Sequence, residues 1–334
     1  MKVLVTGATG FIGSHLVEKL VKEKYEVSVL IKKQKKIQKQ RIDSINLLKK
    51  LNVKIYYGNL LDKNSLNNAV NDNEVIFHLA AIARPMAIKN EEYFKVNEIG
   101  TENLLGVCKN KKIKKIIIMS SISAVGPTRD GKPINEKAEC IPVDTYGWSK
   151  LAQEKVALKY IKKDKLPITI LRPPMVFGPR DYEMLKLFKA VNKRFFPIDG
   201  KEECLEFLYV ENLVEACLLA IEKGKIGEIY HISNKKHYSI NEIIDAIEKA
   251  ENKKIFPVKF PNWSFMIVGF IVEFFGKIFN FHPPFKHDTT EWMTKKVWYS
   301  DISKAKKELN YNPKFSLEEG VKKTVEYYKE KNLL

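Results

Sequence analysis

A tyrosine and a lysine stand four residues apart, at Tyr146 and Lys150, in a stretch whose pattern predicts a helix. Residues four apart share one helix face, so both side chains can reach the same point. A free tyrosine has a pKa of about 10, so proton transfer near neutral pH requires lowering it by roughly two to three units, some 3–4 kcal/mol. The Lys150 ammonium can supply part of this stabilisation. The pair therefore predicts proton transfer, although the same spacing also occurs by chance on amphipathic helices.

Three glycines at Gly7, Gly10 and Gly13 follow the first apolar run of the chain and open a helical pattern. The first permits a tight turn, the second lets backbone N–H groups approach a pyrophosphate, and the third allows close helix–strand packing. The helix N-terminus favours the anion. A purely structural turn is the alternative, but the strand before and the helix after are the context that a dinucleotide site requires.

The residues after the second expected strand bear on the choice of dinucleotide. An acid there accepts hydrogen bonds from a ribose 2′-OH, whereas cations accommodate a 2′-phosphate. The run at residues 31–36 is Ile-Lys-Lys-Gln-Lys-Lys, with Lys32 first among its cations and no acid. We therefore expect NADP(H) to be favoured, with NAD(H) beside a solvated basic loop as the alternative.

Two hydroxyls, Ser120 and Ser121, end the apolar run at 116–119. Open α/β sheets bind ligands at the carboxyl edge of their strands, so these hydroxyls are candidates for contact with a substrate oxygen. Ordinary turn chemistry is the alternative for both.

These groups must be positioned by the secondary structure of the chain. In its first half, short β-rich runs alternate with stretches long enough to form a helix. The runs are residues 2–5, 27–31, 53–57, 75–78, 116–119 and 168–171. Such alternation predicts an α/β fold, a doubly wound parallel sheet with helices on both faces and right-handed crossovers.

The pattern loosens after about Gly178, with helical stretches near 211–223 and 240–250 and a terminal helix from Leu317. We expect residues 1–178 to form the NAD(P)-binding Rossmann domain and 179–334 to form mainly a smaller substrate-binding domain. A strand near 227–231 is expected to return to the main sheet.

Four motifs occur in the order seen in extended short-chain dehydrogenases/reductases, which the chain resembles over nearly its whole length. They are Gly7-x-x-Gly10-x-x-Gly13, Gly58-Asn59-Leu60-Leu61-Asp62, His78-Leu79-Ala80-Ala81 and Tyr146-x-x-x-Lys150. The resemblance implies an NAD(P)-dependent enzyme in which Ser121, Tyr146 and Lys150 are catalytic. Counting back from Gly126 selects Ser121, with Ser120 as the fallback.

The resemblance also implies the cofactor contacts. These are Gly7, Thr9, Gly10, Phe11, Ile12, Gly13, Lys32, Asn59, Leu60, Leu79, Ala80, Ala81, Tyr146, Lys150, Pro173 and Val176. The family usually carries Asp where Asn59 stands, so an adenine contact here would use an amide oxygen. Asn97 resembles a supporting helix asparagine near the cofactor, and a buried asparagine that satisfies backbone groups is the alternative.

Two positions bear on the substrate. Family members that bind nucleotide sugars commonly offer Arg where this chain has Leu205, and another before Asp301, where residues 291–296 supply none. Arg180, Lys295 or Lys296 could substitute for these arginines only imperfectly, as point charges near a diphosphate.

The segment 120–127 and the hydrophobic late segment resemble the 3β-hydroxysteroid-dehydrogenase-like branch. We therefore expect hydride transfer with an alcohol or ketone on an apolar, sterol-like or lipid-like substrate. A nucleotide-sugar epimerase or dehydratase is the alternative. A non-catalytic dinucleotide-binding module is disfavoured by the intact Ser121, Tyr146 and Lys150 set.

The net charge of +18 is spread along the chain without a recognition motif, so no nucleic-acid partner is expected. The four cysteines are widely and irregularly spaced, which predicts neither a metal site nor a disulfide framework. We expect a cytoplasmic homodimer. Residues 263–281 form a broadly apolar pattern too short to span a bilayer. This segment could line a lipidic pocket, contact a membrane surface, or be a core or dimer helix.

Overall fold

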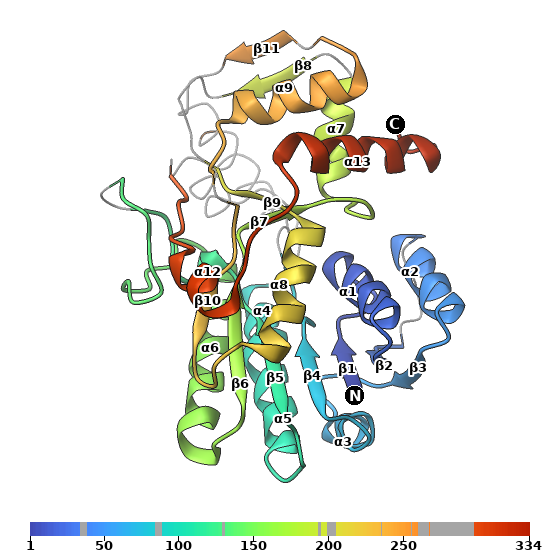
Figure 1. Cartoon of the computed structure of the whole chain (residues 1–334), viewed down its shortest axis with the longest axis vertical. Coiled ribbons are helices and arrows are strands. Elements are labelled where there is room, and N and C mark those ends of the chain that lie inside the picture. Colours follow the sequence, from blue (N-terminus) through green and yellow to red (C-terminus); the bar gives the residue numbers. More distant parts are fainter. Residues whose placement is uncertain are drawn as a thin grey trace.

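The computed structural model describes residues 1–33, 39–83, 89–128, 131–192, 195–198, 205–234, 236–254, 256–259, 267 and 297–334. Its centre is a sheet in which seven strands pair in the order β10-β6-β5-β4-β1-β2-β3 (Figure 1). Every pairing in this sheet is parallel. The strands are β1 (Lys2–Thr6), β2 (Glu26–Ile31), β3 (Lys54–Tyr57), β4 (Val75–His78), β5 (Lys115–Met119), β6 (Ile168–Arg172) and β10 (Ile229–His231). The expected doubly wound parallel sheet is thus confirmed.

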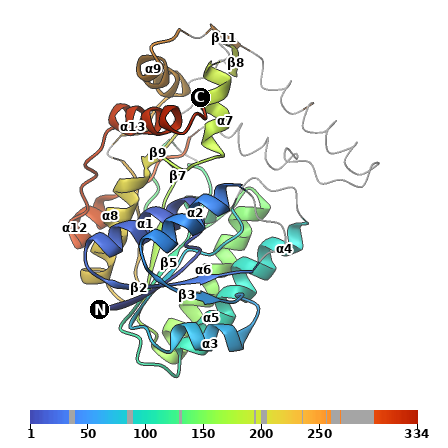
Figure 2. The same cartoon turned by 90° about the vertical axis from the view of Figure 1, so that its right-hand side faces the viewer.

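Helices cover both faces of this sheet (Figure 2). One face carries α1 (Phe11–Lys22), α2 (Lys39–Lys50) and α8 (Val210–Glu222), and the other carries α3 (Lys63–Val70), α5 (Gly100–Cys108) and α6 (Thr145–Asp164). Successive strand residues alternate between two apolar cores: Val3 and Val5 pack toward α1, whereas Leu4 packs toward α3 and α5. Because both faces are buried, the strands read as nearly continuous apolar runs.

Most of the remaining elements gather beyond the carboxyl edge of the sheet, at the top of Figure 1. They are β7 (Met175–Phe177), α7 (Met184–Asn192), β8 (Phe195–Ile198), β9 (Phe207–Tyr209), α9 (Ile240–Glu251), β11 (Phe256–Lys259) and α13 (Leu317–Glu330). The Tyr328 hydroxyl of α13 donates to the Asp181 carbonyl, and its ring lies 5.4 Å from that of Phe188 on α7. The chain leaves the sheet after β6 and returns to it through α8 and β10. Both α8 and β10 are contacted by α12 (Ser303–Leu309).

Local signals explain where key helices begin. The Asp144 side chain caps α6 by accepting from the Gly147 backbone N–H at 2.6 Å. Ser239 with Glu242, and Ser316 with Glu319, form capping boxes at the starts of α9 and α13. These caps fix the first turn of each helix, and in α6 that turn carries Tyr146.

No helix in the described ranges is long and apolar enough to cross a membrane. The expectation for residues 263–281 falls outside the described part of the chain, apart from Ile267. It stays a prediction.

Candidate active site

The candidate residues meet along one edge of the sheet. Strands β1, β4, β5 and β6 are parallel neighbours, so their carboxyl ends at Thr6, His78, Met119 and Arg172 lie on the same side. The strand order reverses direction between β1 and β4, which is the position where open α/β sheets bind their ligands.

The glycine turn between β1 and α1 fits a dinucleotide pyrophosphate. Gly7 has φ +76°, and a Cβ on it would lie 2.6 Å from the Ala80 nitrogen. A Cβ on Gly13 would lie 2.2 Å from the Gly7 carbonyl oxygen. Glycine is therefore required for the turn to form and for α1 to pack against it.

The N-terminus of α1 is open to an anion. Its N-cap is Gly10, which has no side chain to cap the helix, and the first turn from Phe11 contains no acid. The first-turn N–H groups of Phe11, Ile12 and Gly13 and the positive end of the helix dipole thus suit a phosphate. Thr9, half-buried, stands beside this turn.

The end of β2 gathers cations. Lys32 is exposed, Lys33 stacks its ammonium 5.1 Å from the Tyr57 ring centroid, and an Arg41 N–H donates to the Lys32 carbonyl at 2.6 Å. Arg41 belongs to α2 and was not predicted as a site residue, because nothing in its local sequence shows that α2 returns to this strand end. Lys35 and Lys36 lie outside the described residues.

Two expected adenine-side residues have structural partners. The Asn59 Oδ1 accepts from the Leu61 N–H at 3.2 Å in a turn that leads to α3. Leu60 is buried, and its Cβ lies where a Cβ added to Gly100 would be only 3.0 Å away. The side chain of Leu60 thus packs in the core, while Asn59 stays half-buried at the edge.

The residues expected to contact the nicotinamide lie in the loops after β4 and β6 and on β7. Leu79, Ala80 and Ala81 are half-buried, and the Ala80 N–H donates to the Thr6 hydroxyl at 3.3 Å. Pro173 is buried, and its carbonyl accepts from the Ile122 N–H at 2.9 Å. Half-buried Val176 follows on β7.

Tyr146 and Lys150 occupy successive turns of α6 but have different surroundings. Tyr146 is half-buried, whereas Lys150 is only 1% exposed. The Lys150 Nζ donates to the Met119 carbonyl at 2.6 Å and to the Gln153 side-chain oxygen. Burial lowers the pKa of Lys150 to about 7, against the opposing attraction of Glu154. The lysine is therefore held at the end of β5, where burial favours its neutral form more than in a free lysine.

The two serines after β5 have different partners. The Ser120 hydroxyl donates to Glu154, whose carboxylate also accepts from Arg172 at 2.6 and 2.8 Å. The Ser121 hydroxyl accepts from the Ser123 N–H at 3.1 Å, capping a 3-10 turn at Ile122–Ala124. Ser120 is thus tied to a buried ion pair, whereas the Ser121 hydroxyl oxygen is an acceptor in a local turn, and its own proton has no acceptor among the described residues.

Asn97 lies in a π-helical turn, Lys95–Ile99, and is fully buried. Its amide exchanges two hydrogen bonds with the backbone of Ile82, and its Nδ2 also donates to Ser149 at 2.9 Å. These contacts match the alternative of an asparagine that satisfies buried backbone groups. Asn97 joins the loop after β4 to the start of α6, next to Tyr146.

The substrate side is apolar at the position where an arginine could have stood. Leu205 packs against a cluster formed by Ile122, Val125 and Trp298. Next to it, buried Glu206 accepts from the N–H and hydroxyl of Ser300, at 2.8 and 2.7 Å. These bonds tie β9 to the segment before α12.

The cations that could bind a substrate phosphate either form ion pairs within the protein or lie outside the described residues. Arg180 forms a 2.9 Å ion pair with Glu18 of α1. Lys186 pairs with Glu183 at 2.6 Å on the exposed side of α7. Lys295 and Lys296 lie outside the described residues.

Residues 3–233 match the NAD dependent epimerase/dehydratase family. A UDP-N-acetyl-alpha-D-glucosaminuronate decarboxylase from Bacillus cytotoxicus is 29% identical, covering 98% of both chains. A sterol-4-alpha-carboxylate 3-dehydrogenase, decarboxylating, from Mus musculus is 26% identical over 98% of this chain and 91% of that protein. A dTDP-D-glucose 4,6-dehydratase from Dictyostelium discoideum is 33% identical, but the match spans 69% of this chain and 58% of that protein.

Solved structures give the same similarity. The UDP-glucuronic acid 4-epimerase from Bacillus cereus, in complex with UDP-glucuronic acid and NAD, superimposes with a TM-score of 0.79. It is 29% identical, and the match covers 99% of each chain.

Proposed function

The chain belongs to the NAD dependent epimerase/dehydratase family, and we propose that it is a dehydrogenase or reductase of a largely apolar alcohol or ketone. It is an enzyme of the extended short-chain dehydrogenase/reductase type. The proposed substrate is sterol-like or lipid-like, and the proposed cofactor is NADP(H). Residues 1–178 would hold the cofactor, with β10 completing their sheet, and 179–334 would mainly hold the substrate.

The roles proposed for the site residues are those that the family resemblance implies. When bound, the nicotinamide cofactor donates or accepts the hydride. Tyr146 gives its phenolic proton to the substrate oxygen during reduction and takes it back during oxidation. The Lys150 ammonium stabilises the resulting phenolate, and the Ser121 hydroxyl orients the substrate oxygen.

The observation that carries the substrate proposal is the packing of Leu205 against Ile122, Val125 and Trp298. Ile122 follows Ser121 directly and Val125 lies four residues after it, so this apolar cluster is close in sequence to the proposed catalytic hydroxyl. A diphosphate brought into such surroundings without a guanidinium partner would lose its hydration without replacement hydrogen bonds. The name of the mouse sterol-4-alpha-carboxylate 3-dehydrogenase supports the same substrate class.

A nucleotide-sugar enzyme is the second candidate. It is favoured by the Bacillus cytotoxicus decarboxylase, which matches 98% of both chains, and by the Bacillus cereus epimerase. In this case the diphosphate would be held by cations such as Arg180, Lys186 and the exposed Lys189 of α7. Lys193, Lys295 and Lys296, which lie outside the described residues, are further candidates.

Cofactor absorbance distinguishes the two candidates. We expect sterols or lipid alcohols to reduce added NADP in proportion to the product formed. UDP and dTDP sugars should neither bind at micromolar concentration nor be converted. A sugar that binds at that concentration and is epimerised without net change in the cofactor would overturn the proposal.

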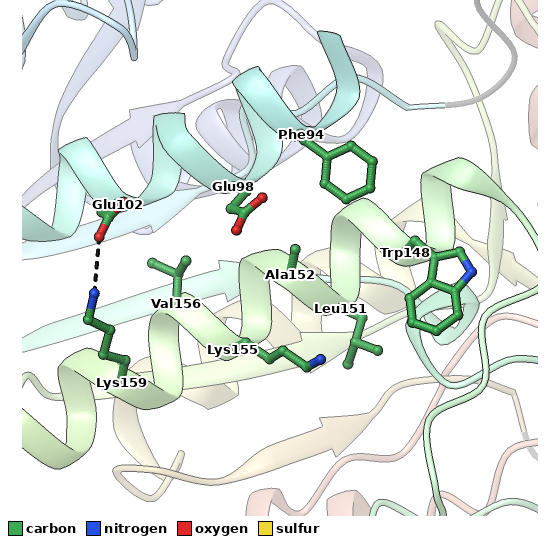
Figure 3. A pocket seen from close by; sticks show the side chains of 9 residues that line it. All are labelled: Phe94, Glu98, Glu102, Trp148, Leu151, Ala152, Lys155, Val156 and Lys159. Carbon is green, nitrogen blue, oxygen red and sulfur yellow. Dashed lines mark hydrogen bonds and ion pairs between the residues drawn. The ribbon is translucent and has the colours of Figure 1, made fainter. Parts of the chain in front are cut away.

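We further propose that the protein is a homodimer, with α6 and the facing helices in the interface. A groove runs between α6 on one side and α4 (Asn90–Phe94), the π-helical turn and α5 on the other (Figure 3). One wall carries Glu98 and Glu102, the other carries Lys155 and Lys159, and Trp148 is 47% exposed at one end. Glu102 and Lys159 already pair across the groove at 3.2 Å (Figure 3). A two-fold axis parallel to the groove would place Glu98 of each acidic wall opposite the basic wall of the partner, which carries Lys155.

The cytoplasmic location and a membrane or lipid contact of residues 263–281 stay predictions. Only Ile267 of that segment is described, and its side chain is exposed.

A further inference from the structure

A chain of buried polar side chains runs from the glycine turn to Lys150. It starts at Thr6 on β1, passes through His78 on β4 and Thr101 on α5, and reaches Gln153 on α6, which accepts from Lys150. The first four side chains are 0% exposed and Lys150 is 1% exposed. Buried polar networks that are fully satisfied hold their members in one arrangement.

The hydrogen bonds in the middle of this chain have one consistent direction. The Thr101 hydroxyl donates to the Asn97 carbonyl at 2.6 Å, so its oxygen accepts from the His78 Nε2 at 2.8 Å and the Gln153 Nε2 at 3.0 Å. Since the nitrogen of Gln153 faces Thr101, its oxygen must face Lys150. The hydrogen bond to Thr101 therefore fixes the orientation of the Gln153 amide.

The far end of the chain is anchored in the cofactor cradle. Burial and the Lys150 charge lower the pKa of His78 to about 3, so the ring is neutral and carries its proton on Nε2. The His78 Nδ1 accepts from the Thr6 hydroxyl at 2.8 Å, and that hydroxyl accepts from the Ala80 N–H. Ala80 is the residue against which Gly7 packs.

Among the charged groups around Lys150, Glu154 attracts the ammonium, but this attraction is smaller than the effect of burial. On α6, the Glu154 carboxylate is engaged by Arg172 and Ser120. On β4, His78 is neutral, and β5 offers only the Met119 carbonyl. Tyr146 stands one turn before Lys150 on α6. The ammonium is thus held by the neutral oxygens of Met119 and Gln153, which leave one of its three N–H groups for a ligand within the described part of the chain.

We propose that Gln153 is a positioning residue: backed by Thr101, His78 and Thr6, its neutral amide oxygen fixes the Lys150 ammonium toward the cofactor cleft without cancelling its charge. This inference rests on dinucleotide binding at the proposed site, but not on the identity of the substrate. Gln153 makes no contact with the reacting atoms in this proposal and acts only through Lys150.

Two substitutions of Gln153 should move the ionisation of Lys150 in opposite directions. Gln153→Glu places a carboxylate against the ammonium and raises the pKa of Lys150, whereas Gln153→Met removes an acceptor and lowers it. Shifts of about one unit or more are expected from an adjacent opposite charge. A loss of packing alone would not produce opposite shifts.

The primary measurement is the affinity of the full-length protein for NADH as a function of pH, followed by nucleotide fluorescence. NADH is chosen because it lacks the 2′-phosphate, a group that itself titrates near pH 6. Affinity should fall as pH rises through the Lys150 pKa, with the midpoint higher in Gln153→Glu and lower in Gln153→Met. Lys150→Met should abolish this pH dependence.

Asn212→Leu is the matched control, because Asn212 is a buried amide on α8 that bonds to Phe315. It should lower stability while leaving the NADH midpoint unchanged. If Gln153→Met does not fold, the near-isosteric Thr101→Val, which removes the support behind Gln153, takes its place with the same expected direction. Unchanged midpoints in the Gln153 and Thr101 variants would overturn the proposal.

A second readout needs no cofactor. A folded-state pKa of about 7, below the usual lysine value, means that the unfolded chain binds more protons between pH 7 and roughly pH 10. The contribution of Lys150 should therefore increase the free energy of unfolding as pH rises through this window. In Gln153→Glu this increase should begin at a higher pH, because the folded-state pKa of Lys150 is raised. If NADH fails to bind, dinucleotide binding is refuted, while this unfolding experiment still tests the role of Gln153.

Discussion

At the scale of single residues, the tasks proposed for Tyr146 and Lys150 can be separated by experiment because the surroundings of the two side chains differ. Tyr146 is half-buried, whereas Lys150 is buried and bonded to Met119 and Gln153. We predict that Tyr146→Phe lowers turnover by roughly 10²–10⁴-fold with little change in dinucleotide affinity, since only the transferable proton is lost. Lys150→Ala should weaken both. Steady-state kinetics and nucleotide fluorescence measure the two effects, and full activity in Tyr146→Phe would refute its role.

The proposed cofactor preference also depends on single side chains. We predict that NADP binds more tightly than NAD, and that Lys32→Glu or Arg41→Gln reduces the preference by roughly tenfold or more, the value of a charge-assisted hydrogen bond. Calorimetric titration with both nucleotides measures it. Lys49→Glu, exposed at the end of α2, is the control and should leave the preference unchanged. Equal affinity of the unaltered protein for NAD and NADP would contradict the assignment.

Sequence reasoning could identify the residues that carry local spacing, but not those assembled by the fold. Tyr146 and Lys150 share one helix, so their spacing alone places them together. Thr101 and Gln153 come from two different helices, and no local pattern shows that their side chains meet. Arg41 was missed for the same reason.

At the scale of elements, the glycine turn depends on close contact between α1 and the end of β1. We predict that Gly13→Ala costs about 1–3 kcal/mol of stability by overpacking and weakens dinucleotide binding, because its Cβ would lie 2.2 Å from the Gly7 oxygen. Gly106→Ala in α5 is the control, since its Cβ would meet only the Tyr160 hydroxyl, at 3.2 Å. Thermal unfolding and nucleotide titration report both effects. A Gly13→Ala protein that binds nucleotide normally would contradict the proposal that the glycine turn binds the dinucleotide.

Buried parallel strands were predictable because their apolar runs are nearly continuous. The short pairs β7–β9 and β8–β11 were not, because each joins segments far apart in the sequence through only three or four residues. The π-helical turn at Lys95–Ile99 was also missed, since its register follows from packing rather than composition.

At the scale of the whole molecule, the acidic and basic walls of the groove in Figure 3 make the dimer testable. We predict that Glu98→Lys or Lys155→Glu alone weakens the dimer by placing like charges opposite each other, and that the double exchange restores it. Lys163→Glu, exposed elsewhere on α6, should have no effect. Light scattering after size exclusion measures the mass. A monomeric unaltered protein at micromolar concentration would refute the interface.

The return of β10 to the sheet also determines when the protein can fold during synthesis. β10 pairs with β6, but it is made only after β7, α7, β8, β9 and α8 have been translated. Until residue 231 has left the ribosome, β6 is an edge strand with unpaired backbone groups, which is a template for aggregation. A fragment that stops at residue 178 would keep this edge of β6 exposed, so we expect the proposed cofactor-binding part to aggregate more readily alone than within the full-length chain. Nascent chains would therefore need protection over this interval, whichever substrate the finished enzyme uses.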